Sequence, residues 1–135
     1  MRSRIFVDSS AFYALSDRHD SNHSVALAAA RQLGIELADL HTTNAVVIET
    51  HSLLLNRLTR EIAAQVMEQI YAGTIRIVRA SERDERRGRE IILRHDDKAY
   101  SFTDTISFAV MERLHLHVAW SYDHHFARFG FQLVP

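Results

Sequence analysis

The stretch Ile5-Phe6-Val7-Asp8-Ser9-Ser10 decides the fold. Its short apolar run ends on a carboxylate, and such a run is typical of a strand buried on both faces of a parallel sheet. We expect Ser9 or Ser10 to cap a helix that begins near Ala11. Ligands of open α/β sheets bind beyond the carboxyl ends of the strands, where Asp8 would lie. A buried carboxylate there is costly unless it is paired or binds a cation.

Outward from this stretch, short strands alternate with helices. Helix starts are marked by common capping residues and two helix ends by glycine: Asn22, Asn44, Thr59, Ser81, Gly34 and Gly73. The predicted helices span residues 24–33, 45–56, 59–72 and 82–94, and a further helix starts at Thr103 or Asp104 and runs to 114. The predicted strands are 5–7, 40–42, 75–78, 117–121 and an edge strand at 131–134. This alternation predicts a parallel sheet covered by helices on both faces.

Composition bounds the class of protein. The chain has 135 residues, 47% of them hydrophobic and 24% charged, with a formal net charge of −1. This is ordinary for a globular protein, and one proline and four glycines leave little room for a linker, so we expect a single domain, 1–135. The absence of cysteine excludes thiolate metal sites. No apolar run suits a membrane span and no signal-peptide pattern is present, so we expect a cytoplasmic protein without a membrane partner.

Four acidic residues stand where a parallel sheet would bring them together. Asp8 and Asp123 each follow a buried strand, so both face the same edge of the sheet. Asp104 lies in the first turn of an apolar helix, where the helix dipole favours an anion. Glu49 falls among apolar neighbours on the core side of its helix. Two carboxylates about 4 Å apart repel by about 4 kcal/mol. Such a group recruits cations, and oxygen ligands suit Mg²⁺ or Mn²⁺.

Five segments of the chain form a pattern that extends over nearly its whole length. They are Phe6-Val7-Asp8-Ser9-Ser10-Ala11, Thr43-Asn44-Ala45-Val46-Val47-Ile48-Glu49, Ser101-Phe102-Thr103-Asp104, Tyr122-Asp123-His124-His125-Phe126 and Phe129-Gly130-Phe131. The most specific part is the Ser-Phe-Thr-Asp motif, followed about twenty residues later by an acid close before Phe126. Together these segments resemble the PIN domain family, and within it the VapC-type toxins of toxin–antitoxin pairs.

This resemblance implies a three-layer α/β/α fold with a central, mainly parallel sheet. It also implies cleavage of single-stranded RNA by water that a Mg²⁺ ion activates, with Mn²⁺ as an alternative ion. The catalytic residues would all be acidic: Asp8, Glu49, Asp104 and Asp123. Three of them would be the metal ligands: Asp8, Asp104 and Asp123. Hydrogen bonds from supporting residues would orient the carboxylates: Ser9, Asn44 and Thr103. Similar toxins are homodimers that a small VapB-like antitoxin neutralises.

Two other functions stay open for the same fold. One is a PIN-like binding or scaffold protein whose acids hold a metal ion without cleaving RNA, and the other is a housekeeping nuclease without an antitoxin. Two other kinds of aspartate site fit poorly. A phosphatase of the haloacid dehalogenase type needs a second acid where Ser10 stands, and a response-regulator receiver needs a late lysine after an apolar strand, which Lys98 is not.

Basic and histidine residues are harder to assign. The arginines of residues 81–94 alternate with acids, which is typical of a solvated helix with many ion pairs, and an RNA-binding role is the alternative. His19 and His23 have the spacing of zinc ligands on a helix, yet the residues between them are typical of a helix start. His124 or His125 could touch the substrate. The helix at 59–71 could bury its apolar stripe in the core or in a dimer interface.

Overall fold

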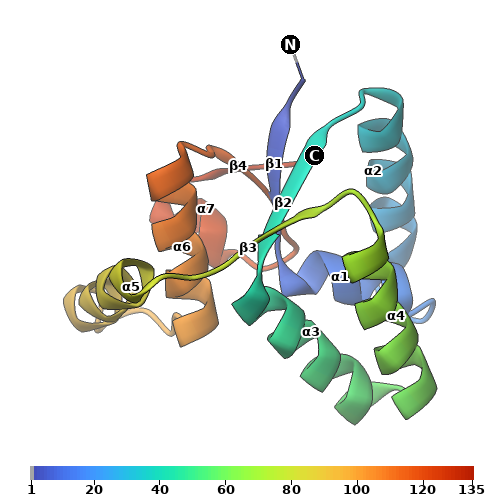
Figure 1. Cartoon of the computed structure of the whole chain (residues 1–135), viewed down its shortest axis with the longest axis horizontal. Helices are drawn as coiled ribbons and strands as arrows, with labels where there is room; N and C mark the ends of the chain where they lie inside the picture. The colour runs from blue at the N-terminus through green and yellow to red at the C-terminus, as the bar shows by residue number, and fades with distance from the viewer. Residues whose placement is uncertain (1) are drawn as a thin grey trace.

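The computed structural model describes residues 2–135 and places the opening apolar run at the centre of a five-stranded sheet (Figure 1). Strand β1 spans Arg4–Val7, and its last three residues are at most 4% exposed. The other strands are β2 Asp39–Thr43, β3 Arg76–Val78, β4 Val118–Trp120 and β5 Gln132–Leu133. They pair in the order β3-β2-β1-β4-β5, and every pair is parallel. The central place of β1 explains its apolar residues on both faces.

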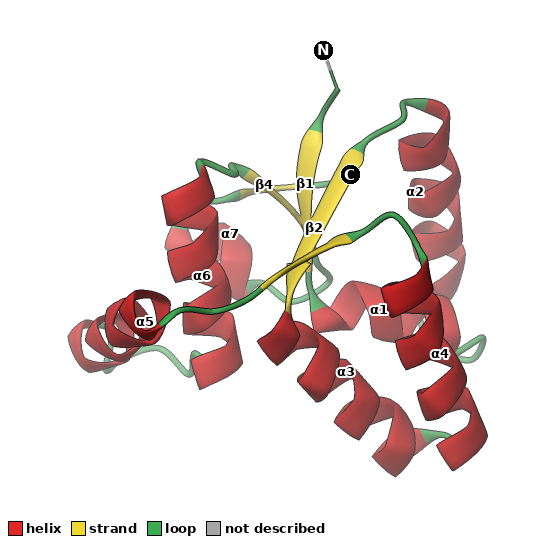
Figure 2. Cartoon of the chain, viewed as in Figure 1, coloured by secondary structure: helices red, strands yellow, loops and turns green. Residues whose placement is uncertain are grey.

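Helices cover both faces of the sheet (Figure 2). Their bounds are α1 Ser9–Ser16, α2 His23–Ile35, α3 Asn44–Arg57, α4 Arg60–Ala72, α5 Glu82–Arg94, α6 Phe102–Leu114 and α7 His125–Phe129. Helices α1 to α4 lie on one side of the sheet and α5 to α7 on the other. The predicted three-layer α/β/α fold with a parallel sheet is confirmed. Within residues 2–135 no helix combines the length and apolar character of a membrane span.

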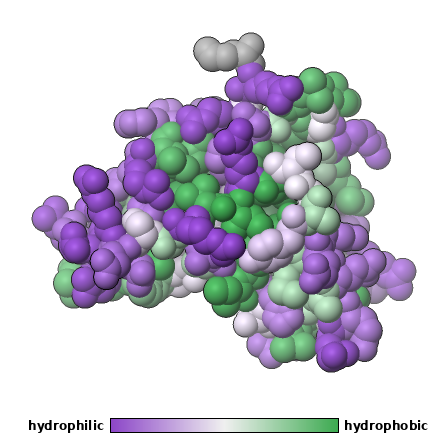
Figure 3. All heavy atoms as spheres, viewed as in Figure 1, coloured by the Kyte–Doolittle hydropathy of each residue, from purple (hydrophilic) through white to green (hydrophobic). Residues whose placement is uncertain are grey.

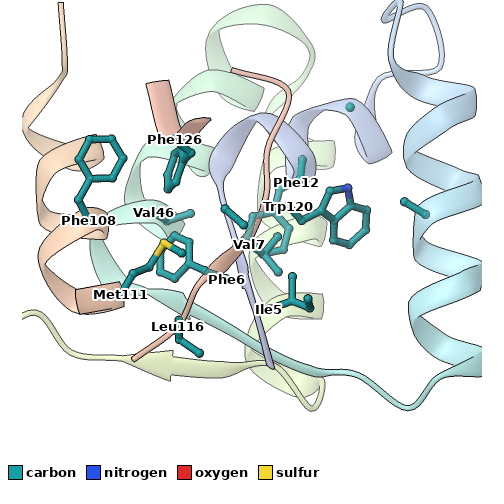
Figure 4. Close-up of a cluster of buried hydrophobic side chains, with 14 of the residues drawn as sticks. Ile5, Phe6, Val7, Phe12, Val46, Phe108, Met111, Leu116, Trp120 and Phe126 are labelled. Carbon is teal, nitrogen blue, oxygen red and sulfur yellow. The ribbon is translucent and has the colours of Figure 1, made fainter. Parts of the chain in front are cut away.

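The core packs around β1 and fixes the segments that carry the acids (Figure 4). The rings of Phe6 and Phe126 lie 6.1 Å apart between centroids, and Phe108 meets Phe126 edge to face at 5.0 Å. Such pairs contribute about 0.5–1.5 kcal/mol beyond their buried area. Phe126 follows Asp123 by three residues, and Phe108 lies one turn after Asp104 in α6. Both acids are therefore held in place relative to β1.

An ion pair between a buried aspartate and a partly exposed arginine attaches α5 to α6. Asp84 is 2% exposed and accepts hydrogen bonds from Arg113 Nε at 2.9 Å and Nη2 at 2.8 Å. Burial acts to raise the pKa of Asp84, but the hydrogen bonds from Arg113 and Ser81 outweigh it, so the pKa is lowered. Gly88 lets the two helices approach closely, because a Cβ there would lie 3.1 Å from Thr105 Oγ1.

The predicted cap of α1 is wrong. Asp8, rather than Ser9 or Ser10, is the N-cap, and its side chain accepts a hydrogen bond from the backbone N–H of Ser10. Aspartate and serine are about equally good N-caps, so three consecutive candidates leave the choice to the tertiary structure. Because Asp8 has this role, the helix starts immediately after the strand and the carboxylate stays at the edge of the sheet.

Three other predicted helix caps or ends also differ, strand ends shift by a residue, and the short helix α7 was not predicted. Thr43 caps α3 in place of Asn44, since its hydroxyl accepts from a backbone N–H of the first turn at 3.1 Å. Ser101 caps α6, so this helix begins at Phe102. Helix α2 continues through Gly34 for one more residue. The predicted caps Thr59 and Ser81 and the terminal Gly73 are confirmed.

Candidate active site

The carboxyl edge of the sheet carries a cavity of about 370 Å³ with a largely polar lining. Asp8 follows β1, Glu49 lies on α3, Asp104 is in the first turn of α6, and Asp123 follows β4. Helices α1 and α3 leave the sheet at this edge, and α6 begins at the same end of the molecule (Figure 1). The structure thus brings all four predicted acids to the lining of one cavity.

Asp8 is the most buried of the four acids, with 2% of its surface exposed. Its Oδ2 accepts hydrogen bonds from Ser10 Oγ at 2.7 Å and from Ser121 Oγ at 3.0 Å. Burial raises the pKa of Asp8, and the charge of Asp104 raises it further, whereas the serine hydrogen bonds lower it. Within residues 2–135 the one hydrogen bond to its Oδ1 is a long one, from Ser9 Oγ at 3.5 Å. This oxygen is therefore left for a further ligand.

Glu49 is connected to Asp8 through a serine. Ser9 Oγ donates to Glu49 Oε2 at 2.8 Å, so the residue predicted to support the site does contact two of its carboxylates. Burial raises the pKa of Glu49, the bond from Ser9 lowers it, and the charges of Asp8, Asp104 and Asp123 raise it. The core-side position of Glu49 on α3 therefore faces other acids.

Asp104 and Asp123 form a second pair with a histidine between them. Asp104 Oδ2 accepts from the Ser101 backbone N–H at 3.1 Å and lies 2.8 Å from His125 Nδ1. The same Nδ1 lies 3.2 Å from Asp123 Oδ1, which accepts the backbone N–H of His125 at 2.8 Å. The imidazole tautomer with its proton on Nδ1 donates to this pair. The capping box of α6 and the turn before α7 thus orient both carboxylates.

The donor atoms fit a divalent cation. One ligand atom each from Asp104, Asp123 and His125 lies within 4.8 Å of the others, close to the span of ligands that share one ion at about 2.0–2.1 Å. Among the described residues Asp8 is not part of this close group of three, although it lines the same cavity. Burial, and after it the charge of neighbouring acids, raises the pKa values of Asp8 and Glu49, and a cation would neutralise that acidic charge. Carboxylate oxygens are the ligands of Mg²⁺ and Mn²⁺.

Two residues predicted to orient the carboxylates have other partners. Asn44 Oδ1 accepts the backbone N–H of Ala80 at 2.9 Å, which ties the start of α3 to the segment after β3. The hydrogen bond of Thr103 lies within α6, where its backbone oxygen accepts from Ser107 Oγ. Neither side chain lines the cavity, and within residues 2–135 neither donates to a carboxylate of the site.

Other residues of the site lacked a clear signal in the sequence. Ser121 and Ser10 donate hydrogen bonds to Oδ2 of Asp8. Serines at strand ends and helix starts are too common for the sequence to indicate this role. His125 carried one hint, since it stands two residues after Asp123. Tyr13 and Arg57 also line the cavity. Their approach depends on how α1 packs against α3, which no local pattern encodes.

Known proteins are similar to this chain in sequence and fold. A model of the PIN domain family matches residues 5–132. The chain is 32% identical to the 23S rRNA-specific endonuclease VapC20 of Mycobacterium tuberculosis. The 127 aligned residues cover 94% of this chain and 95% of that protein. The crystal structure of the same Mycobacterium tuberculosis protein, a Sarcin-Ricin loop cleaving toxin, gives a TM-score of 0.85 at 31% identity, over 94% of this chain and 95% of that one.

Two more distant solved structures have the same fold. VapBC2 from Rickettsia felis, bound to a DNA fragment from its promoter, gives a TM-score of 0.65 at 11% identity and covers 97% of each chain. DNA-bound VapBC from Salmonella typhimurium gives 0.70 at 9% identity, over 99% of this chain and 98% of that one. At these identities the likeness concerns the fold alone. The motifs, the family match and the VapC20 relationship agree, and the chain belongs to the PIN domain family.

Proposed function

We propose that this protein is a Mg²⁺-dependent endoribonuclease and the toxin of a toxin–antitoxin pair, with Mn²⁺ as an alternative ion. The observation that carries the proposal is the convergence of four acids from separate segments on one cavity. It is supported by the 32% identity to an rRNA endonuclease that covers 94% of this chain. Acids placed together in this way cost stability unless they serve a cation.

The proposed metal ligands are Asp104, Asp123 and the free oxygen of Asp8, with His125 beside them. When bound, the ion polarises the phosphate and lowers the pKa of a water molecule. Ser10 and Ser121 hold Asp8 in a fixed orientation from the other side of its carboxylate. Such outer hydrogen bonds keep ligands in position before substrate arrives.

Glu49 is the carboxylate best placed to take up a proton. Its pKa is raised by burial and by its acidic neighbours, which brings it closer to the range in which a general base works. The Ser9 hydroxyl fixes one of its oxygens and leaves the other for a water molecule. Attack of that water on phosphorus, in line with the leaving 3′ oxygen, would give 5′-phosphate and 3′-hydroxyl ends.

The proposed partners follow from the relatives. Single-stranded RNA, in a loop or an open strand, is the proposed substrate, because the VapC20 relative acts on 23S rRNA. A small VapB-like antitoxin is the proposed inhibitor, as VapBC pairs are among the structures with this fold. The protein would act in the cytoplasm as a homodimer and as a single domain, residues 1–135.

Cleavage of labelled RNA by the purified protein tests the proposal. Wild type should cut only when Mg²⁺ or Mn²⁺ is present, and Asp8→Asn should lose at least a hundredfold in rate because a ligand is removed. The matched control is Asp96→Asn, an exposed acid in the loop before α6, which should keep the wild-type rate. Wild-type activity in Asp8→Asn, or a metal-independent rate, would rule out this function. A scaffold protein would show no cleavage above the Asp8→Asn level.

A further inference from the structure

Arg57 is the last residue of α3 and lies on the same helix face as Glu49. Glu49, Leu53 and Arg57 recur every fourth residue, and all three line the acidic cavity. Eight residues of helix place Arg57 about 12 Å along the axis from Glu49. The arginine therefore stands at the outer end of the cavity, away from the converging carboxylates.

The guanidinium of Arg57 is held against an aromatic ring. Its Cζ lies 5.2 Å from the ring centroid of Tyr13, within the range of a cation–π contact. Tyr13 is fixed in turn, because its hydroxyl donates to Asp17 Oδ2 at 2.7 Å, a bond that raises the pKa of Tyr13. The ring is a rigid base for an exposed arginine, which reduces the freedom that the side chain loses on binding an anion.

Arg57 is a basic residue in a cavity that is lined by acidic residues. Five carboxylates line the cavity, and Arg57 is the one lysine or arginine among the lining residues that the structure describes. Within residues 2–135 no carboxylate lies in ion-pair distance of Arg57, unlike Arg87 and Arg113. Its planar fork, which suits a phosphate, is therefore available.

Three of the five arginines of α5 have acidic side chains beside them. Arg87 pairs with Glu90 and Glu112, and Arg113 of α6 pairs with Asp84. Arg86 and Arg89 lie in a shallow site together with Glu82 and Glu85, so their charges balance. Figure 3 shows a hydrophilic surface over α5. The residues named above carry charges of both signs there, which favours the solvated, ion-paired interpretation of this helix.

We propose that Arg57, held against Tyr13, binds an RNA phosphate outside the cleaved bond. This inference rests on the proposed ribonuclease function. A strand that enters an acidic cavity is repelled unless a cation lies beside its path, and the guanidinium of Arg57 is such a cation.

Salt dependence of RNA binding tests this without cleavage. With Asp8→Asn as the inactive parent, a short single-stranded RNA is titrated at several KCl concentrations and fixed Mg²⁺. Arg57→Ala should reduce the slope of log affinity against log salt by about 0.7, the share of one phosphate contact on a single strand. Affinity at low salt should fall about tenfold. Arg57→Lys should keep the slope, because it keeps the charge.

Arg60→Ala is the matched control, since Arg60 is exposed at the start of α4 and lies outside the cavity. An unchanged slope in Arg57→Ala, or an equal reduction in Arg60→Ala, would overturn the inference. In the active background Arg57→Ala should raise KM and leave kcat nearly unchanged. Failure of the proposed function is seen separately, as absence of Mg²⁺-dependent cleavage by wild type.

Discussion

Two raised carboxyl pKa values should make the metal-free protein less stable as the pH rises. Burial and the charge of Asp104 raise the pKa of Asp8 above its usual 3.8, and burial and the other acids raise that of Glu49 above 4.5. Between these unfolded values and the higher folded values, the native state holds protons that the unfolded chain has released. The free energy of unfolding therefore falls as the pH rises through this window.

Each such proton contributes a slope of at most about 1.4 kcal/mol per pH unit, so Asp8 and Glu49 together reach about 2.7 kcal/mol per unit. Asp8→Asn removes one contribution and Glu49→Gln the other. In each variant the free energy of unfolding should decrease less with pH than in wild type. Each variant should also be more stable than wild type at the upper end of the window. Urea unfolding of metal-free protein from about pH 5 to about pH 8 measures these slopes.

His41 changes the pH dependence of stability in the opposite direction. Burial lowers its pKa, so the folded protein favours its neutral form and gains stability from it as the pH rises. Its contribution is the same in wild type and in the carboxyl variants, so the difference between them isolates the two acids. Mg²⁺ in excess should flatten the wild-type profile by binding the ionised carboxylates. Equal profiles for wild type and Asp8→Asn would refute the reasoning.

Three further substitutions test the packing that positions the site. Arg113→Met leaves the 2% exposed carboxylate of Asp84 without its cation and should cost about 3 kcal/mol in urea unfolding; a cost below about 1 kcal/mol would contradict a structural ion pair. Phe108→Ala removes the ring between Phe126 and Phe129 and should cost about 3–5 kcal/mol, and an unchanged Tm would argue against this core. Gly88→Ala places a Cβ 3.1 Å from Thr105 Oγ1 and 3.3 Å from the backbone N of Ile106. Because the backbone cannot move aside easily, this crowding should outweigh the roughly 1 kcal/mol that alanine gains in helix propensity, so the Tm should fall; an equal or higher Tm would argue against tight packing of α5 on α6.

The architecture was predictable because its signals are local. An apolar run that ends on Asp8 predicts a strand buried on both faces, and β1 is the central strand of the sheet. The alternation of strands and helices then leaves a parallel sheet as the arrangement that buries every apolar stripe. Glu49 was recognisable for the same reason, since a glutamate on the apolar side of a helix needs a partner.

Contacts between distant segments were not predictable from these signals. Asn44 looks like a helix cap and a supporting residue, but its actual partner is the backbone of Ala80, 36 residues away. His125 reaches Asp104 across 21 residues because of the turn that precedes α7. Arg57 meets Tyr13 only when α1 and α3 pack together. In each case the three-dimensional packing, rather than spacing along the chain, decides the neighbour.

The converging acids are proposed to form one metal-dependent nuclease site. The most direct measurement is the single-turnover rate of RNA cleavage during a Mg²⁺ titration, with wild type and Asp104→Asn prepared in parallel. The wild-type rate should rise with Mg²⁺ and saturate, and the rate of Asp104→Asn should be at least a hundredfold lower at every concentration. A variant that follows the wild-type curve, with the same maximum and midpoint, would contradict the account.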